Sequence, residues 1–185
     1  MAEALPASPG LRWQRRTGFS AVTLRHSVDD VRARLALEAA GLPCCSTPGR
    51  IAGDGPWLAW RSPGECLGLS FDPTPLHLAW AALAPGRCDT AVVLDLSHAL
   101  ALYELHGPGL DDWLARLVDA SAIPRQPGLA TRCRLIEVTV DLWRLAPERL
   151  WLLADRHLAP WVAQWLDYAQ AGATSGPSAQ RRFVS

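Results

Sequence analysis

Two stretches of the chain carry the same pattern and decide the fold: Thr23-Leu-Arg-His-Ser-Val-Asp-Asp-Val-Arg-Ala-Arg-Leu35 and Tyr103-Glu-Leu-His-Gly-Pro-Gly-Leu-Asp-Asp-Trp-Leu-Ala-Arg-Leu117. Each predicts a short strand, a turn with an Asp-Asp pair, and a helix that contains Ala-Arg-Leu. The sequence that follows also matches, because Trp57–Leu69 and Val140–Leu152 both predict a strand ending in Trp-Arg, a turn with Pro and Glu, and a returning strand. A repeat of this length predicts duplication of a β-α-β-β-α unit, whose two copies pack into one body.

The remaining periodicities place the other elements. Ser27 is a good cap for the first helix and Gly41 a good stop for it, while Asp155 can cap the last helix. The predicted strands are 21–26, 56–61, 66–70, 91–97, 99–106, 134–144 and 149–154, and the predicted helices are 27–40, 75–83, 111–119 and Leu158–Ala169.

The predicted fold class is α+β, with mostly antiparallel sheets and helices on one face. Each half resembles a ferredoxin-like β-α-β-β-α-β unit. We expect the first half at residues 19–97 and the second at 98–170. Residues 1–18 and 171–185 lack periodicity, so we expect them to be mobile tails.

Composition excludes several classes of function. The chain has 185 residues, of which 49% are hydrophobic and 19% charged, which predicts a sizeable core. The formal net charge is zero, so nucleic acid is not an expected partner. All 18 basic residues are Arg, which excludes a lysine Schiff base or a lysine general base. No apolar run approaches the roughly 20 residues that cross a bilayer, so we expect no membrane association.

The cysteines indicate a reducing compartment. There are five, an odd number, with no C-x-x-C spacing and no secretory signal before them, which is typical of a cytoplasmic protein. Adjacent Cys44 and Cys45 lie in a Pro-flanked loop, where a redox or metal role is an alternative.

Residues that resemble catalytic motifs have simpler explanations. Asp95, Ser97 and His98 suggest a triad, but on a strand Asp95 and Ser97 face one side and His98 the other, so we expect them to cap and turn the chain. The histidines show no metal-ligand spacing. Gly107-Pro-Gly109 lacks the pattern of a phosphate loop. The acidic pairs Asp29-Asp30 and Asp111-Asp112 fall in first helical turns, where the helix dipole explains them. The sequence therefore predicts no catalytic residue and no metal site.

Taken together, these residues resemble the gamma subunit of heterotetrameric sarcosine oxidase, over about four fifths of the chain. The wider folate-binding fold of the glycine-cleavage T-protein carries weaker versions of the same structural motifs. The pattern differs at Cys66, where an aromatic residue is usual, and at His157, where Ser is common. The resemblance is clearest at Asp95-Leu-Ser-His98, the Gly107-Pro108 turn, Asp112-Trp-Leu-Ala-Arg116, Arg132-Cys-Arg-Leu-Ile-Glu-Val138, Leu142-Trp-Arg144, Leu150-Trp-Leu-Leu-Ala-Asp155 and Trp161-x-x-x-Trp-Leu166.

The resemblance implies a small non-catalytic subunit that assembles with alpha, beta and delta chains. The assembly would oxidatively demethylate sarcosine or a related N-methyl amine, giving formaldehyde or methylene-tetrahydrofolate. FAD, FMN, NAD and tetrahydrofolate would be held by the partner subunits, with no cofactor in this chain.

One alternative stays open, a stand-alone folate-binding or aminomethyltransferase-like protein. It would need a carboxylate to hold the pterin, and Asp95 or Glu137 are the candidates that the sequence offers. A scaffold of the same fold with an unrelated role is a third hypothesis.

Overall fold

The computed structural model describes residues 10–26, 31–39, 41–42, 45–82 and 91–174. They form two five-stranded sheets in which every pairing of neighbouring strands is antiparallel. The N-terminal sheet has the order β3-β4-β5-β2-β6, built from Ile51–Ala52, Trp57–Ser62, Glu65–Ser70, Ser20–His26 and Ala91–Asp95. The C-terminal sheet has the order β1-β7-β10-β9-β8, built from Arg12–Arg16, Leu100–His106, Arg149–Asp155, Val138–Ala146 and Leu129–Leu135.

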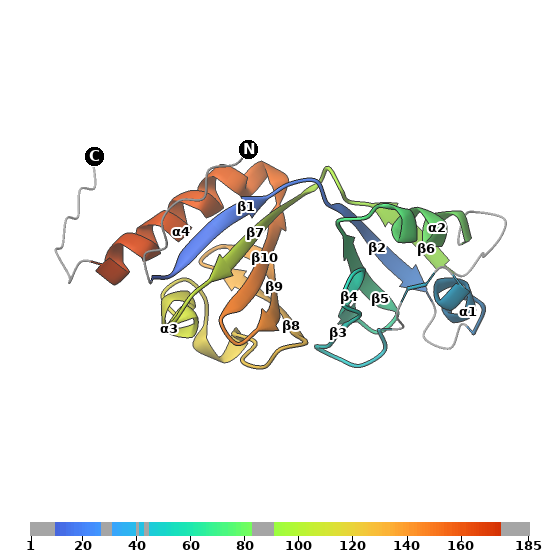
Figure 1. Cartoon of the computed structure of the whole chain (residues 1–185), viewed down its shortest axis with the longest axis horizontal. Helices are drawn as coiled ribbons and strands as arrows, with labels where there is room; N and C mark the ends of the chain where they lie inside the picture. The colour runs from blue at the N-terminus through green and yellow to red at the C-terminus, as the bar shows by residue number, and fades with distance from the viewer. Residues whose placement is uncertain (1–9, 27–30, 40, 43–44, 83–90, 175–185) are drawn as a thin grey trace.

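The two repeat units exchange their first strands. β1 precedes β2 in the chain but lies in the C-terminal sheet beside β7, whereas β6 precedes β7 but lies in the N-terminal sheet beside β2. Figure 1 shows the two connections, β1 to β2 and β6 to β7, running between the sheets on the same side of the molecule. The repeat units therefore begin at these edge strands, and each sheet is completed by the opposite unit.

The helices cover the outer faces and the sheets pack against each other. Helices α1 (Val31–Ala39) and α2 (Thr74–Ala82) lie over the N-terminal sheet, and α3 (Leu110–Leu114) and α4 (Ala159–Thr174) over the C-terminal sheet (Figure 1). Because side chains alternate between the faces of a strand, each sheet contributes both to a core under its helices and to a shared core between the sheets. The α+β class, the duplication and the antiparallel sheets are thus confirmed.

The intersheet core is rich in aromatic side chains. Trp151 meets Trp57 edge to face with ring centroids 4.7 Å apart, and meets Phe71 at 5.8 Å. Trp143 lies 6.3 Å from Trp151 in the neighbouring strand. Such rings bury large areas and favour edge-to-face contacts, so this cluster joins the two sheets into one body.

The repeat is real, but its residue-by-residue alignment is shifted by one position. The sequence pairs Trp60 with Trp143 because each is followed by Arg, yet Trp60 packs on the core under α1 and α2 and Trp143 lies between the sheets. The strand pairings explain the shift, since Cys66 is opposite Trp60 and Leu150 is opposite Arg144. Trp60 is therefore equivalent to Arg144, because period-two side-chain alternation moves every residue to the other face when the register slips by one.

Several predicted boundaries were wrong. The expected tail of residues 1–18 contains β1, and the expected tail of 171–185 is helical up to Thr174. The long strand predicted over 134–144 is the β8–β9 hairpin, which turns at Ile136 with φ 54°. Helix α3 ends at Leu114, short of the predicted Asp119, because the chain there leaves the helix to form a bridge between Val118 and Leu135. A short strand that the sequence did not predict, β3, precedes β4.

The described helices include none that is long and apolar enough to cross a membrane.

Candidate functional site

A cleft of about 300 Å³ opens between the sheets, where the turn after β3 faces the β9–β10 hairpin. Its position follows from the fold, because the two sheets are joined by main-chain bonds beside it. The amide of Ile51 donates to the carbonyl of Gly128 at 2.8 Å, and the amide of Ala130 donates to the carbonyl of Gly49 at 2.8 Å. The cleft is lined by Ile51, Gly53, Asp54, Trp57, Gly128, Arg144, Leu145 and Arg149.

One wall of the cleft is apolar and continuous with the intersheet core. Trp57, Ile51 and Leu145 are each partly buried against that core. The indole of Trp57 is held edge to face by Trp151, whose side chain is fully buried. The aromatic surface in the cleft is therefore rigid, which suits a flat or apolar group rather than a flexible polar chain.

The other wall carries a guanidinium tied to a buried carboxylate. Arg149 donates through Nε to Oε1 of Glu104 at 2.7 Å, and Arg16 donates through Nη1 to Oε2 at 2.6 Å. The Glu104 side chain is 9% exposed, while that of Arg149 is 46% exposed. The Arg16 guanidinium also lies 5.0 Å from the centroid of the Phe71 ring, a cation–π distance. One buried carboxylate is thus shared by two arginines, one from each of the strands that flank β7.

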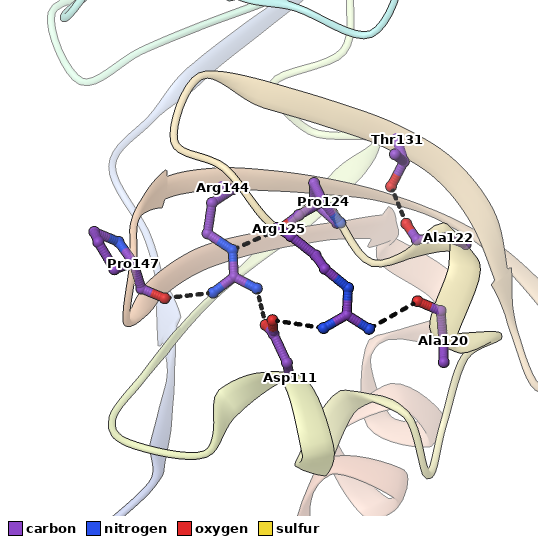
Figure 2. Close-up of polar contacts among 8 residues, drawn as sticks. All are labelled: Asp111, Ala120, Ala122, Pro124, Arg125, Thr131, Arg144 and Pro147. Carbon is purple, nitrogen blue, oxygen red and sulfur yellow. Dashed lines mark hydrogen bonds and ion pairs between the residues drawn. The ribbon is translucent and has the colours of Figure 1, made fainter.

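Arg144, one of the residues that line the cleft, is fully buried and holds together the segments around Asp111, Pro124 and Pro147, as Figure 2 shows. Arg144 donates through Nε to the carbonyl of Pro124 and through Nη1 to that of Pro147, both at 2.8 Å. Its Nη2 pairs with Asp111 at the start of α3. Asp111 also accepts from Arg125 at 3.3 Å, on the solvent side. Every nitrogen of the Arg144 guanidinium thus has a partner, which is what makes a buried arginine tolerable.

A second ion pair crosses between the sheets. Arg61 of β4 donates through Nη2 to Asp141 of β9 at 2.5 Å, and the two side chains are 11% and 10% exposed. Arg61 also lies 3.8 Å from Glu65. The Trp-Arg pairs of the two repeats therefore serve different contacts, Arg61 between the sheets and Arg144 beneath α3.

The residues predicted to turn the chain after β6 do so. Oδ1 of Asp95 accepts from the amide of Ser97 at 2.8 Å. Hydrogen bonding from the Ser97 side chain, with a smaller contribution from this amide, holds the pKa of the Asp95 carboxyl below its usual value. The Ser97 hydroxyl accepts from the amide of Ala21 at 3.0 Å, which fixes the end of β6 against β2. Asp95 and Ser97 therefore act as strand-end residues, as expected from their spacing.

The two carboxylates proposed for a pterin lie apart from the cleft. Asp95 is exposed at the end of the N-terminal sheet, and Glu137 is exposed in the β8–β9 turn, where its carbonyl accepts from Arg134 at 2.6 Å. Neither lines the cleft. The sequence reasoning missed Glu104 and Arg144. The only indication of them in the sequence is that each is a charged residue within an otherwise apolar strand, a pattern that predicts a buried ion pair.

Of the cysteines that the structure describes, Cys45 and Cys66 are buried and Cys133 is partly buried. Cys45 donates to the carbonyl of Arg50 at 3.3 Å and Cys66 to the carbonyl of Cys45 at 3.1 Å. Hydrogen bonding to Cys66 lowers the pKa of the Cys45 thiol, whereas burial, with a smaller effect of Asp141, raises the pKa of Cys133 to about 11. Cys44 and the Asp29-Asp30 pair lie outside the described residues. Within the described ranges, no group of three His, Cys, Asp or Glu side chains is placed to hold a metal ion.

Solved structures share this fold along almost the whole chain. A chain of the heterotetrameric sarcosine oxidase from Corynebacterium sp. U-96 superposes with a TM-score of 0.81 and 24% identity, over 95% of this chain and 91% of that chain. The glycine cleavage system aminomethyltransferase T from Bartonella henselae superposes with a TM-score of 0.56 and 13% identity, over 84% of this chain and 45% of that chain. No protein-family model and no curated protein matches the sequence. At these identities the likeness is one of fold.

The geometry allows the cleft to bind but gives it few reactive groups. Its ionisable side chains are Asp54, Arg144 and Arg149, of which Arg144 is fully occupied by its own contacts. Trp57 offers an aromatic surface, and Arg149 keeps terminal nitrogens beyond its bond to Glu104. Such a set suits contact with an anion or with another protein.

Proposed function

We propose that this chain is a non-catalytic, gamma-type subunit of a heterotetrameric sarcosine oxidase-like flavoenzyme. The observation that carries the proposal is the fold match to a chain of such an enzyme, which covers nearly all of both chains. A match over both full lengths supports an equivalent subunit more strongly than a match to one domain of a larger protein. The T-protein comparison is of the second kind, since this chain spans less than half of that protein.

In the proposed assembly, alpha, beta and delta chains hold FAD, FMN, NAD and tetrahydrofolate. The complex oxidatively demethylates sarcosine or a related N-methyl amine in the cytoplasm and passes the one-carbon unit on as formaldehyde or methylene-tetrahydrofolate. In this proposal the chain provides a rigid surface for contact with the other subunits and takes no part in the chemical reaction. The buried ionisable residues support that division, because Glu104, Asp141 and Arg144 are committed to ion pairs that hold the chain's own strands and loops.

Co-expression tests the proposal. The chain is tagged and expressed together with its genomic neighbours, and native mass spectrometry and flavin absorbance are measured on what co-purifies. A yellow complex containing one copy of each of four chains is expected, with amine-dependent turnover that falls when this chain is omitted. Stoichiometric flavin bound to the purified chain alone, or a fully active complex that assembles without it, would contradict the proposal.

The second candidate is a stand-alone folate-binding or aminomethyltransferase-like protein. The fold shared with aminomethyltransferase T and the aromatic, arginine-bearing cleft favour it. Titration calorimetry of the purified chain with tetrahydrofolate tests it, with Trp57→Ala as the cleft variant and Asp95→Asn and Glu137→Gln for the carboxylates proposed from the sequence. Absence of heat with the unmodified chain at high protein concentration rejects this candidate.

A further inference from the structure

The edge strand β6 presents apolar side chains that nothing described in the structure covers. β6 lies at one margin of the N-terminal sheet, and within the described residues it pairs only with β2 (Figure 1). Val92 is 52% exposed and Leu94 is 48% exposed. An edge strand has a row of outward-facing amides and carbonyls, and apolar side chains on such an edge make it a template for pairing with another strand.

The equivalent edge of the other sheet is protected. β1 occupies the same position in the C-terminal sheet, and its sequence Arg12-Trp-Gln-Arg-Arg16 supplies three arginines and one glutamine. Charged side chains on an edge oppose strand addition because pairing would desolvate them. The two edges are related by the repeat, yet β6 carries Ala-Val-Val-Leu before its first charge. Of these two edges, only β6 is therefore suited to pairing with a strand of another chain.

The charges around β6 are self-complementary. Asp95 lies at one end of the strand, and Arg25 and His26 of β2 lie beside its other end, opposite Val92 and Ala91. The Arg25 side chain is 62% exposed and pairs through Nε with Glu65 of β5 at 3.3 Å, which leaves its terminal nitrogens to face the β6 edge of a second copy. When two such edges meet antiparallel about Val93, the acidic end of each strand reaches the basic end of the other.

The apolar residues match in the same register. Antiparallel pairing about Val93 places Val92 of each copy opposite Leu94 of the other, and Ala91 opposite Asp95. No like charges are then directly opposed, which would otherwise destabilise the pair. The small Ala91 also leaves room for the Asp95 carboxylate to approach His26 in the next strand.

We propose that a second copy of this chain docks on β6, antiparallel about Val93, so that the N-terminal sheets of the two copies become continuous across a twofold axis. This interface is isologous, because the same patch is used on both copies. It is independent of the proposed enzyme complex, since it concerns the chain by itself.

Light scattering coupled to size exclusion, and native mass spectrometry, test the proposal on the purified full chain. The unmodified chain is expected to be a dimer. Leu94→Arg is expected to raise the dissociation constant at least about tenfold, because it places a charge opposite Val92 of the second copy. Leu35→Arg is the matched control, since Leu35 is 55% exposed and belongs to α1 instead of β6. Circular dichroism checks that both variants keep the fold.

Cross-linking tests the register. Val92→Cys and Leu94→Cys chains are mixed under mild oxidation, and peptide mass spectrometry is expected to find a disulfide joining position 92 of one copy to position 94 of the other. A monomeric unmodified chain at all concentrations overturns the proposal, as does a Leu35→Arg effect equal to that of Leu94→Arg. Protection of β6 amides from hydrogen exchange only when other subunits are present would assign the edge to a different chain. None of these results bears on whether the flavoenzyme complex forms.

Discussion

Replacing Arg144 by Met should strongly destabilise the chain while leaving its shape intact. The guanidinium is buried and makes three contacts, to the carbonyls of Pro124 and Pro147 and to the Asp111 carboxylate. Each carbonyl that loses its donor costs about 1 kcal/mol. The broken ion pair adds about 1–2 kcal/mol, less than the roughly 3–5 kcal/mol of a fully buried pair, because Asp111 is partly solvated and keeps Arg125. Met is close in volume to Arg, so the cavity contribution is small.

The expected loss is therefore about 3–4 kcal/mol of unfolding free energy, or roughly 6–16 °C in melting temperature for a chain of this size. Urea unfolding followed by tryptophan fluorescence measures it. Arg125→Met is the matched control, because its guanidinium is 61% exposed and binds the other side of Asp111, so a change below about 1 kcal/mol is expected. The reasoning is refuted if Arg144→Met unfolds within about 1 kcal/mol of the unmodified chain, or if the Arg125 variant loses as much.

Three further predictions concern other contacts. Arg61→Met should lower the unfolding free energy by about 2–4 kcal/mol in urea titrations, because it leaves the nearly buried Asp141 carboxylate without its main partner. A loss of less than about 1 kcal/mol, which is typical of an exposed ion pair, would contradict this prediction. Gly107→Ala should destabilise more than Gly109→Ala in thermal melts, since a Cβ at Gly107 would lie 2.8 Å from main chain whereas one at Gly109 meets nothing within 4 Å, and both have positive φ. The raised pKa of Cys133, about 11, leaves little thiolate near neutral pH, so its alkylation rate by iodoacetamide should still be rising well above pH 9, the ordinary thiol value, and a plateau below that pH would be inconsistent.

Elements defined by local pattern could be predicted from the sequence. The spacing of apolar residues from Leu158 to Ala169 is a property of one segment, and α4 forms there. The β8–β9 hairpin could not be predicted from the sequence, because its turn places Ile136 at positive φ. Such positions normally carry Gly or Asn, so the sequence contains no residue that indicates a turn there. Strand β1 could not be predicted for a different reason. Its arginine-rich sequence resembles a solvated tail, and it becomes a strand only through pairing with β7 and the packing of Trp13 on Tyr103.

The candidate site depended almost wholly on tertiary structure. The turn after β3 and the β9–β10 hairpin are far apart in the sequence, so no motif joins Trp57 to Arg149. The partners of Glu104 could not be identified either, because Arg16 belongs to the exchanged strand and reaches it from the opposite repeat. By contrast, the strand-end role of Asp95 and Ser97 followed from a spacing of two residues, which is a local relation.

The exchange of β1 and β6 makes the two repeats mutually dependent. A fragment ending at residue 82 would keep β1 but lose the β7 edge on which it pairs, and its own sheet would lack β6. Two identical units of this kind could complete each other's sheets by exchanging their first strands, and such domain swapping is a low-cost route to a symmetric dimer. The present chain has the geometry of such a swapped dimer whose subunits have been fused end to end. In a single polypeptide the two edge strands need not have the same sequence, so one of them can be basic and the other apolar.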